Sequence, residues 1–306
     1  MSIRLEHVSY AYEDNSSKKN YALKEINLEI KKEEFIAVIG HTGSGKSTLI
    51  QHLNGLIKPT SGTIYFDDED IYSEGYPLRE LRGKVGICFQ YPEHQLFETT
   101  ILDDVCFGPM NFGKTKEEAT EIAVKCLKDV GLSEKLYQKS PFELSGGQKR
   151  RVAIAGILAM EPEYFILDEP TAGLDPNERI RFRNLISELS EDRLVLLSTH
   201  IVSDIEYIAN EIWLMKDGEV LHKGSIEELI NSMTETVWEC LVPKNRVSDF
   251  MEKYKISNMK SEINQIMLRI ISHEKPVENA MRVEASLEDV FLYYFGEKAG
   301  DENATL

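Results

Sequence analysis

The feature that most constrains the fold is a glycine-rich stretch at positions 40–47, which matches the pattern G-x-x-x-x-G-K-[S/T]. A short apolar run, rich in β-branched residues, precedes it and predicts a buried strand over 35–39. Residues 48–55 follow with helical spacing and a closing glycine, so a helix is predicted there. A glycine-rich turn with a chance lysine is the alternative interpretation. The flanking strand and helix instead favour a loop that cradles nucleotide phosphates.

The residue types in this loop suit phosphate chemistry. Its glycines let backbone N–H groups turn toward one anion, and the N-terminus of the following helix adds partial positive charge. Lys46 is expected to reach the β- and γ-phosphates of a nucleoside triphosphate, and Ser47 to hold Mg²⁺. The predicted phosphate-binding residues are Gly40, His41, Thr42, Gly43, Ser44, Gly45, Lys46, Ser47 and Thr48.

The charge of the chain argues against nucleic acid as a partner. The 306 residues include 35 Lys and Arg against 52 Asp and Glu, which gives a net charge of −17. An acidic chain without a long basic run is unsuited to binding the phosphate backbone of nucleic acids. No apolar run approaches the roughly 18–20 residues needed to span a bilayer, and no signal segment is recognised at the N-terminus. We therefore expect a cytoplasmic protein, peripheral if it works at a membrane.

The rest of the first 230 residues predicts an α/β fold around the loop. Residues 3–12 and 22–30 alternate in polarity and predict an antiparallel hairpin. Residues 85–89 predict another buried strand. From about 91 to 160 the pattern becomes mostly helical, with a capped helix over 116–130. The expected architecture is a core of strands and helices with an antiparallel β subdomain and a helical insert.

Side chains able to act on a phosphate follow several of the predicted strands. Asp168 and Glu169 end an apolar strand; the first suits Mg²⁺ ligation and the second could polarise an attacking water. His200 lies just beyond another strand, where a neutral imidazole could donate to the γ-phosphate, although a lone histidine there is more often structural. Gln90 could touch Mg²⁺ or the water. Tyr12 could stack on an adenine ring, but a core or surface tyrosine is nearly as consistent with the pattern.

A second glycine element lies at positions 144–148 and leads into a helix predicted over 149–160. Two glycines behind a serine at a helix start make another anion site. One γ-phosphate on Lys46 does not need a second cradle from the same chain. We therefore expect the second cradle to serve the nucleotide of a partner, with two subunits facing head to tail. Its residues are Ser145, Gly146, Gly147 and Gln148.

The last seventy-odd residues predict a small C-terminal α+β appendage. Strands are expected over 236–242 and 265–272, and helices over 245–254 and 286–295. The predicted organisation is a nucleotide-binding domain over 1–232 with its insert at about 91–160, an appendage over 233–300, and a tail over 301–306.

Taken together and in this order, these motifs resemble the ATP-binding cassette (ABC) ATPases over roughly residues 1–230. The Ser-Gly-Gly-Gln element makes the resemblance specific among P-loop families. It implies a P-loop NTPase core that hydrolyses ATP to ADP and phosphate with Mg²⁺. The roles it implies are adenine stacking for Tyr12, Mg²⁺ association for Asp168, the catalytic carboxylate for Glu169, the switch histidine for His200, and dimer communication for Asp175.

Three segments, at 40–55, 89–98 and 142–153, resemble more narrowly the energy-coupling factor transporter ATPases. That family powers uptake of vitamins and transition-metal ions. The resemblance implies a second ABC ATPase subunit in a homo- or heterodimer, a transmembrane coupling subunit, a substrate-capture membrane protein, and a place on the cytoplasmic face of the cell membrane. The residues His41-Thr42 and Tyr91-Pro92-Glu93-His94 favour a resemblance to the second of the two ATPases that work as a pair in that family.

From about Asn177 onward the motifs are more similar to those of drug and peptide exporter ATPases, notably at 198–206 and 286–291. An exporter subunit is therefore the alternative. The groove that should receive the membrane subunit lies within about 90–140, in the importer-like half, which favours uptake. A soluble cassette protein of DNA repair or translation is disfavoured, since the chain carries one cassette, lacks long coiled coils and is acidic.

Overall fold

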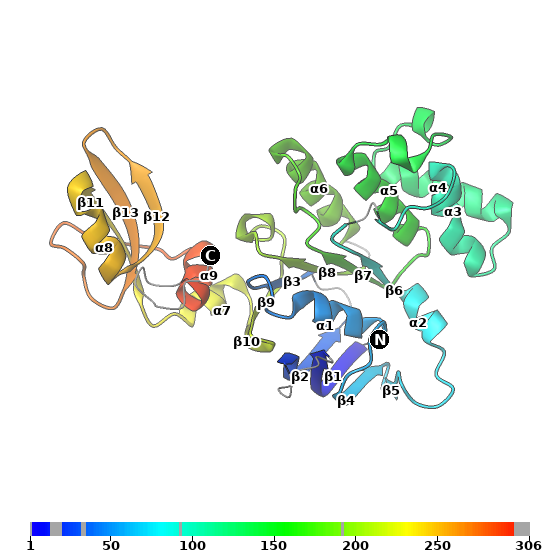
Figure 1. The fold of residues 1–306 in the computed structure, drawn as a ribbon, viewed down its shortest axis with the longest axis horizontal. Helices are drawn as coiled ribbons and strands as arrows, with labels where there is room; N and C mark the ends of the chain where they lie inside the picture. The colour runs from blue at the N-terminus through cyan, green and yellow to red at the C-terminus, as the bar shows by residue number, and fades with distance from the viewer. Residues whose placement is uncertain (1, 13–19, 32–34, 92–93, 191–192, 297–306) are drawn as a thin grey trace.

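The computed structural model describes residues 2–12, 20–31, 35–91, 94–190 and 193–296. Their strands form three sheets. Two of the sheets share one part of the molecule with most of the helices, and the third lies at one end of the molecule (Figure 1).

The central sheet carries the nucleotide-site motifs. Its order is β10-β9-β3-β8-β7-β6, and every neighbouring pair except β10 and β9 is parallel. All residues of β3, β6, β7 and β8 are buried, because both faces of this parallel sheet are covered by other elements. The strands are β3 (Phe35–Ile39), β6 (Val85–Cys88), β7 (Tyr164–Asp168), β8 (Leu194–Thr199), β9 (Glu211–Lys216) and β10 (Glu219–Gly224).

The two faces of this sheet belong to different hydrophobic clusters, since successive side chains of a strand point to opposite sides. Ile36 and Val38 pack with helix α1 (Lys46–Leu53) and the N-terminal sheet. Phe35, Ala37 and Ile39 pack on the opposite side, with α5 (Gly146–Leu158) and α6 (Pro176–Leu189). Figure 1 shows α1 on one side of the sheet and α5 and α6 on the other.

The N-terminal sheet is antiparallel, in the order β2-β1-β4-β5. Its hairpin of β1 and β2 brings Tyr12 opposite Asn20 at the end nearest the phosphate loop. The strands are β1 (Ser2–Tyr12), β2 (Asn20–Lys31), β4 (Ser61–Phe66) and β5 (Glu69–Asp70), and a short helix, α2 (Leu78–Lys84), leads from this sheet to β6.

The segment between β6 and β7 is helical, as predicted. It contains α3 (Ile101–Asn111), α4 (Lys116–Asp129) and α5. Thr115 and Glu118 form the predicted capping box at the start of α4. The helix predicted over 149–160 begins earlier, at Gly146, because Ser145 and Gln148 form a capping box of their own.

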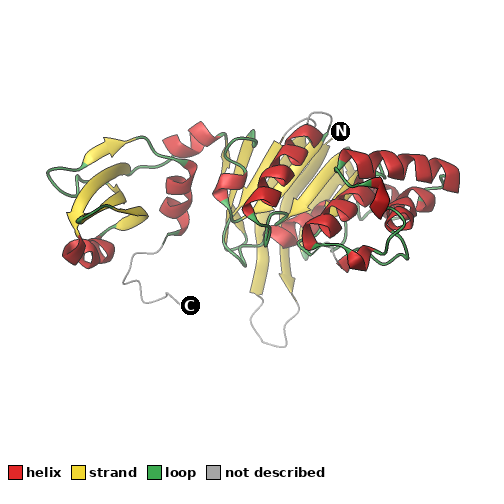
Figure 2. Cartoon of the chain, turned by 90° about the horizontal axis from the view of Figure 1, so that it is seen from above, coloured by secondary structure: helices red, strands yellow, loops and turns green. Residues whose placement is uncertain are grey.

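The C-terminal sheet is antiparallel, in the order β12-β13-β11-β14. It stands apart from the rest at one end of the molecule (Figure 2), and α7 and α9 lie between it and the central sheet (Figure 1). The sequence predicted β11, β13, α8 and α9 but missed β12 and β14. The elements of this part are α7 (Ile226–Asn231), β11 (Thr236–Pro243), α8 (Val247–Lys253), β12 (Lys255–Ser261), β13 (Gln265–Ser272), β14 (Met281–Val283) and α9 (Leu287–Phe295). The predicted tail over 301–306 lies outside the described residues. Among those residues, no helix has the length and apolar character needed to cross a membrane.

Candidate active site

The glycine-rich stretch forms a tight loop between β3 and α1. Gly43 and Gly45 have φ angles of 82° and 101°, which L side chains rarely adopt. A Cβ on Gly40 would also collide with the backbone oxygen of Met215 on β9. The turn between β9 and β10 supports the loop from the side, because the N–H of Gly218 donates to the Ser44 oxygen at 3.0 Å. The loop shape is thus set by backbone contacts that require glycine.

Lys46 begins α1 and is almost fully buried. Its Nζ donates to the backbone oxygens of Gly40 and His41 at 2.7 and 3.0 Å. The same Nζ lies 3.4 Å from Oε1 of Glu169, and both side chains are less than a tenth exposed. A buried lysine held by carbonyls and one carboxylate is a fixed positive charge beside the loop.

Asp168 and Glu169 at the end of β7 have different surroundings. Ser198 on β8 donates its hydroxyl to Asp168 Oδ1 at 2.5 Å. Glu169 has a φ of 46°, a left-handed conformation that costs a non-glycine residue about 1–3 kcal/mol. Its N–H donates to the Ser198 backbone oxygen at 3.1 Å, which holds this turn. The turn directs the Glu169 carboxylate toward Lys46 and toward His200, whose Nδ1 lies 2.7 Å from Oε2.

These groups line a cavity of about 540 Å³ between the phosphate loop, the N-terminal hairpin and the strand ends. Of the predicted site residues it is lined by Tyr12, Thr42, Gly43, Gly45, Lys46, Ser47, Thr48, Gln90, Glu169 and His200. Gly40, His41, Ser44 and Asp168 adjoin the cavity without lining it.

Tyr12 stands at the open side of this cavity. The residue is about half exposed, at 52 %. Its hydroxyl lies 3.1 Å from Thr48 Oγ1 on α1, and its ring meets the edge of Tyr10 with centroids 5.0 Å apart. An exposed aromatic face held from behind is available for a flat heterocycle.

The thiol that precedes Gln90 by two positions takes no part in this chemistry. Cys88 is buried at the end of β6. Burial raises its pKa to about 12, despite the nearby Arg150. The thiol therefore stays protonated at physiological pH, so a nucleophilic cysteine beside the cavity is excluded.

The second glycine element lies away from this cavity, at the N-terminus of α5 in the helical insert. Ser145 and Gly146 are exposed. A Cβ on Gly146 would meet nothing within 4 Å, so no neighbour within the described chain explains a glycine there. The structure does not bring Ser145, Gly146, Gly147 and Gln148 together with Lys46.

Comparisons with known proteins agree with this geometry. The family model described as ABC transporter matches residues 23–172. The energy-coupling factor transporter ATP-binding protein EcfA2 of Lactococcus lactis subsp. lactis is 50 % identical over 76 % of this chain and 81 % of its own length. Its namesake from Caldanaerobacter subterraneus subsp. tengcongensis is 42 % identical over 97 % of this chain and 99 % of its own. The chain belongs to the family of energy-coupling factor transporter ATP-binding proteins.

A solved structure adds the fold of an ABC ATPase. It is an ATP-binding cassette, dimeric, in a post-hydrolysis state with ADP and Pi, and it matches with a TM-score of 0.66 at 34 % identity, covering 73 % of this chain and 98 % of its own. The relative that spans 97 % of the chain also reaches across the later part, where the motifs resembled exporter ATPases. This ABC ATPase therefore aligns with the energy-coupling factor family along nearly its whole length.

Two groups of residues at the site of this ABC ATPase escaped sequence reasoning. Asn20, Tyr21 and Ala22 at the start of β2 line the cavity opposite the phosphate loop. Ser198 binds Asp168 through its hydroxyl and Glu169 through its backbone. The signal for Ser198 was its place beside the end of β7, in a parallel neighbour strand. No comparable signal pointed to Asn20, because its position depends on the register of the hairpin.

Proposed function

We propose that this chain hydrolyses ATP in the cavity between the phosphate loop and the strand ends, and that hydrolysis drives uptake by an energy-coupling factor transporter. The convergence of Lys46, Glu169 and His200 in one cavity carries the proposal. Lys46 would bind the β- and γ-phosphates, which would replace Glu169 as its ion-pair partner. Glu169 would then be free to orient and polarise the attacking water, with His200 holding its carboxylate and donating toward the γ-phosphate.

The donor set around the loop fits Mg²⁺ bound together with ATP. Ser47 and Gln90 line the cavity with oxygen-bearing side chains, and Asp168 lies behind them at the end of β7. Among the described residues no cluster of three His, Cys, Asp or Glu forms a stand-alone metal site. That suits Mg²⁺, which keeps several waters and takes substrate phosphates as ligands. The bound ion would neutralise charge that develops on the phosphates.

A second ATPase subunit is part of this proposal. The exposed Ser145 and Gly146 would bind the γ-phosphate held on the partner's loop, so that two subunits enclose two nucleotides. The open space beside Gly146 supports a close approach by a ligand from outside the chain. The dimeric state of the similar cassette supports the same arrangement. The pair could be two copies of this chain or this chain with a related one.

The membrane partners would dock on the helical insert near Gln90. Three large aromatic residues that follow Gln90 in the chain, Tyr91, Phe97 and Phe107, are 43–56 % exposed. The rings of Phe97 and Phe107 meet edge to face with centroids 4.7 Å apart, which makes a contiguous apolar surface. A transmembrane coupling subunit with a short apolar helix fits this surface, and a substrate-capture membrane protein would complete the transporter. The ATPase would then be peripheral, on the cytoplasmic face of the cell membrane.

Isolation of the native complex in mild detergent tests the transport role. We expect a multi-span coupling subunit and a small substrate-capture protein to copurify with the chain. Recovery of a single large permease instead would favour an exporter, and recovery of ribosomes without membrane proteins would contradict both transport roles. Hydrolysis by the complex should stop when EDTA removes Mg²⁺ and return when Mg²⁺ is restored.

A further inference from the structure

The last helix of the chain, α9, ends against the phosphate loop. The His41 side chain in that loop places its Nε2 3.1 Å from the backbone oxygen of Phe295. Because a carbonyl oxygen only accepts hydrogen bonds, Nε2 must carry the hydrogen and donate. The rings of Phe291 and Phe295 meet the imidazole nearly edge-on, with centroids 5.4 and 4.9 Å away. Part of the nucleotide loop is therefore held by a helix more than 240 residues further along the chain.

The C-terminal end of α9 joins three parts of the molecule. The final carbonyls of a helix have no partner within the helix and attract cationic or N–H donors. Here three successive carbonyls each receive a side-chain donor from a different element. The pairs are Lys255 Nζ of β12 with Tyr293 O at 2.9 Å, Lys216 Nζ of β9 with Tyr294 O at 3.3 Å, and His41 Nε2 of the phosphate loop with Phe295 O at 3.1 Å.

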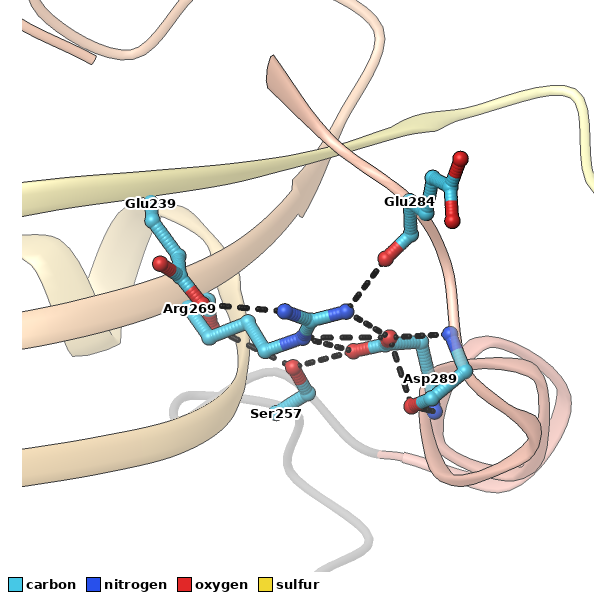
Figure 3. Close-up of polar contacts among 6 residues, drawn as sticks. Glu239, Ser257, Arg269, Glu284 and Asp289 are labelled. Atoms are coloured by element: carbon cyan, nitrogen blue, oxygen red, sulfur yellow. Dashed lines mark hydrogen bonds and ion pairs between the residues drawn. The ribbon is translucent and has the colours of Figure 1, made fainter. Parts of the chain in front are cut away.

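The N-terminal end of α9 is fixed to the C-terminal sheet by a buried ion pair (Figure 3). Asp289 is 1 % exposed and accepts from Arg269 Nε and Nη2, at 3.0 Å and 2.7 Å, and from Ser257 at 2.6 Å. Burial alone would raise the pKa of Asp289, but the hydrogen bonds from Arg269, Ser257 and Ser286 outweigh it and hold the pKa below its usual value. The carboxylate stays ionised, so the sheet and the helix are held together.

The other face of α9 belongs to the core of the nucleotide-binding part. Leu287, Val290 and Phe295 are buried in the same hydrophobic cluster as the central sheet. The helix also packs on the single turn at Val202–Asp204, which follows His200 by two residues. The helix therefore contacts the chain at both sides of the proposed active site, at the phosphate loop and beyond His200.

We propose that α9 is a positioning element for the phosphate loop, and that His41 transmits its position to the phosphate-binding lysine. The His41 backbone oxygen accepts from Lys46 Nζ at 3.0 Å, so the residue held by α9 itself holds Lys46. A loop fixed in its binding shape binds ligand more tightly than a loop that must be ordered first. The C-terminal sheet thus sets the affinity of the loop for ATP through α9. This inference rests on the nucleotide site proposed above.

A double-mutant cycle between His41 and Phe295 in the full chain tests it. His41→Leu keeps side-chain bulk but removes the donor to α9, and Phe295→Leu removes the ring that packs on His41. Each change should weaken binding of a fluorescent ATP analogue by about fivefold, and the double mutant should bind no more weakly than the weaker single mutant. The KM for ATP should rise with the Kd, and kcat should change less. His41→Gln retains an N–H donor and should bind more tightly than His41→Leu.

Control variants separate positioning from loss of fold and from failure of the site itself. Leu292→Ala shortens a half-buried neighbour on α9 and should leave the Kd within about twofold of wild type. Thermal unfolding of each variant checks that the fold is retained, and His41 is exposed enough to be replaced safely. Wild-type affinity in His41→Leu and Phe295→Leu, or additive losses in the double mutant, would overturn the positioning role. Wild-type affinity in Lys46→Ala would instead overturn the nucleotide site.

Discussion

The N-termini of α1 and α5 are both glycine-rich and both are proposed to face phosphate, yet in the described part of the chain only the N-terminus of α5 is capped by side chains. Helix α1 begins after Gly45, whose φ is 101°, and no side chain within the described residues caps it. Helix α5 begins after Ser145, and Ser145 and Gln148 cap each other reciprocally. Among the residues that the structure describes, the start of α1 has no side-chain cap, whereas the capping box at the start of α5 uses the N–H groups of Ser145 and Gln148 and does not involve those of Gly146 and Gly147.

Their surroundings differ in the same sense. The start of α1 lies in a cavity of about 540 Å³ shared with Glu169 and His200. The start of α5 is exposed, with open space beside Gly146. The comparison indicates that one end is built to hold a nucleotide and the other to present a ready surface to something outside the chain. Changes at the two ends should therefore have separable effects on binding and on turnover.

The largest expected effect is on turnover at the α1 end. Glu169→Gln removes the charge that would polarise the attacking water but keeps the shape of the side chain. ATP hydrolysis should fall by about 10²–10⁴-fold while ATP binding is retained. Steady-state phosphate release and equilibrium nucleotide binding measure the two. Glu121→Gln, on the exposed face of α4, is the matched control. Hydrolysis that survives largely intact would remove Glu169 from this role.

Lys46→Ala should mainly affect binding. It removes the buried charge next to the loop, so ATP affinity should drop by about 30–100-fold, as expected for loss of charge-assisted hydrogen bonds to phosphate. Isothermal titration with ATP and Mg²⁺ gives the affinity. Lys125→Ala on α4 is exposed and should bind as wild type. If Lys46→Ala also binds as wild type, the loop is not the phosphate cradle.

A methyl group at the α5 end should lower turnover alone. Gly146→Ala and Gly156→Ala add the same methyl at opposite ends of α5, and at both positions it meets nothing within 4 Å of the chain. Gly146→Ala should lower hydrolysis by about tenfold through a misplaced phosphate contact across the dimer, with binding to the isolated chain unchanged. Gly156→Ala should change neither hydrolysis nor binding. Equal loss of binding and hydrolysis in Gly146→Ala would mean that the two ends serve one self-contained site.

The smallest expected effect concerns the adenine side of the cavity. Tyr12→Ala removes the exposed ring and should weaken ATP binding by about five- to tenfold, the lower range for base stacking on an aromatic side chain. Tyr12→Phe keeps the ring and loses only the contact with Thr48, so it should retain most of the affinity. Competition by ATP and by inorganic triphosphate separates the contribution of the base from that of the phosphates, because only ATP carries a base. An equal loss for both competitors would contradict stacking.

Local signals predicted most of the fold. The buried strands, the loop and the capped helix over 116–130 depend on residues within a few positions of one another, and the structure contains them. The Asp217–Gly218 pair is typical of a two-residue hairpin turn, and both residues have the positive φ that such a turn needs. The edge strands β12 and β14 were missed because they are short or largely polar and exposed. Only pairing with β13 and β11 makes them strands.

The candidate site was predictable where spacing along the chain carries the chemistry. The phosphate loop, the two acids after β7 and His200 line or adjoin one cavity, as their places at strand ends indicated. Their roles stay predictions. The wall formed by Asn20, Tyr21 and Ala22 depends on hairpin register, and the contact of His41 with α9 joins distant segments. Neither leaves a pattern within a short window of sequence.

The support of the phosphate loop by the β9–β10 turn has a practical consequence. The Gly218 amide points at the loop backbone and stays hydrogen-bonded only while the loop rests against the turn. Its exchange with deuterium is therefore a native probe of loop opening, in a segment with no proposed contact to ATP. Slower exchange of this one amide on adding nucleotide would show that the loop opens less often, and the measurement needs no added label.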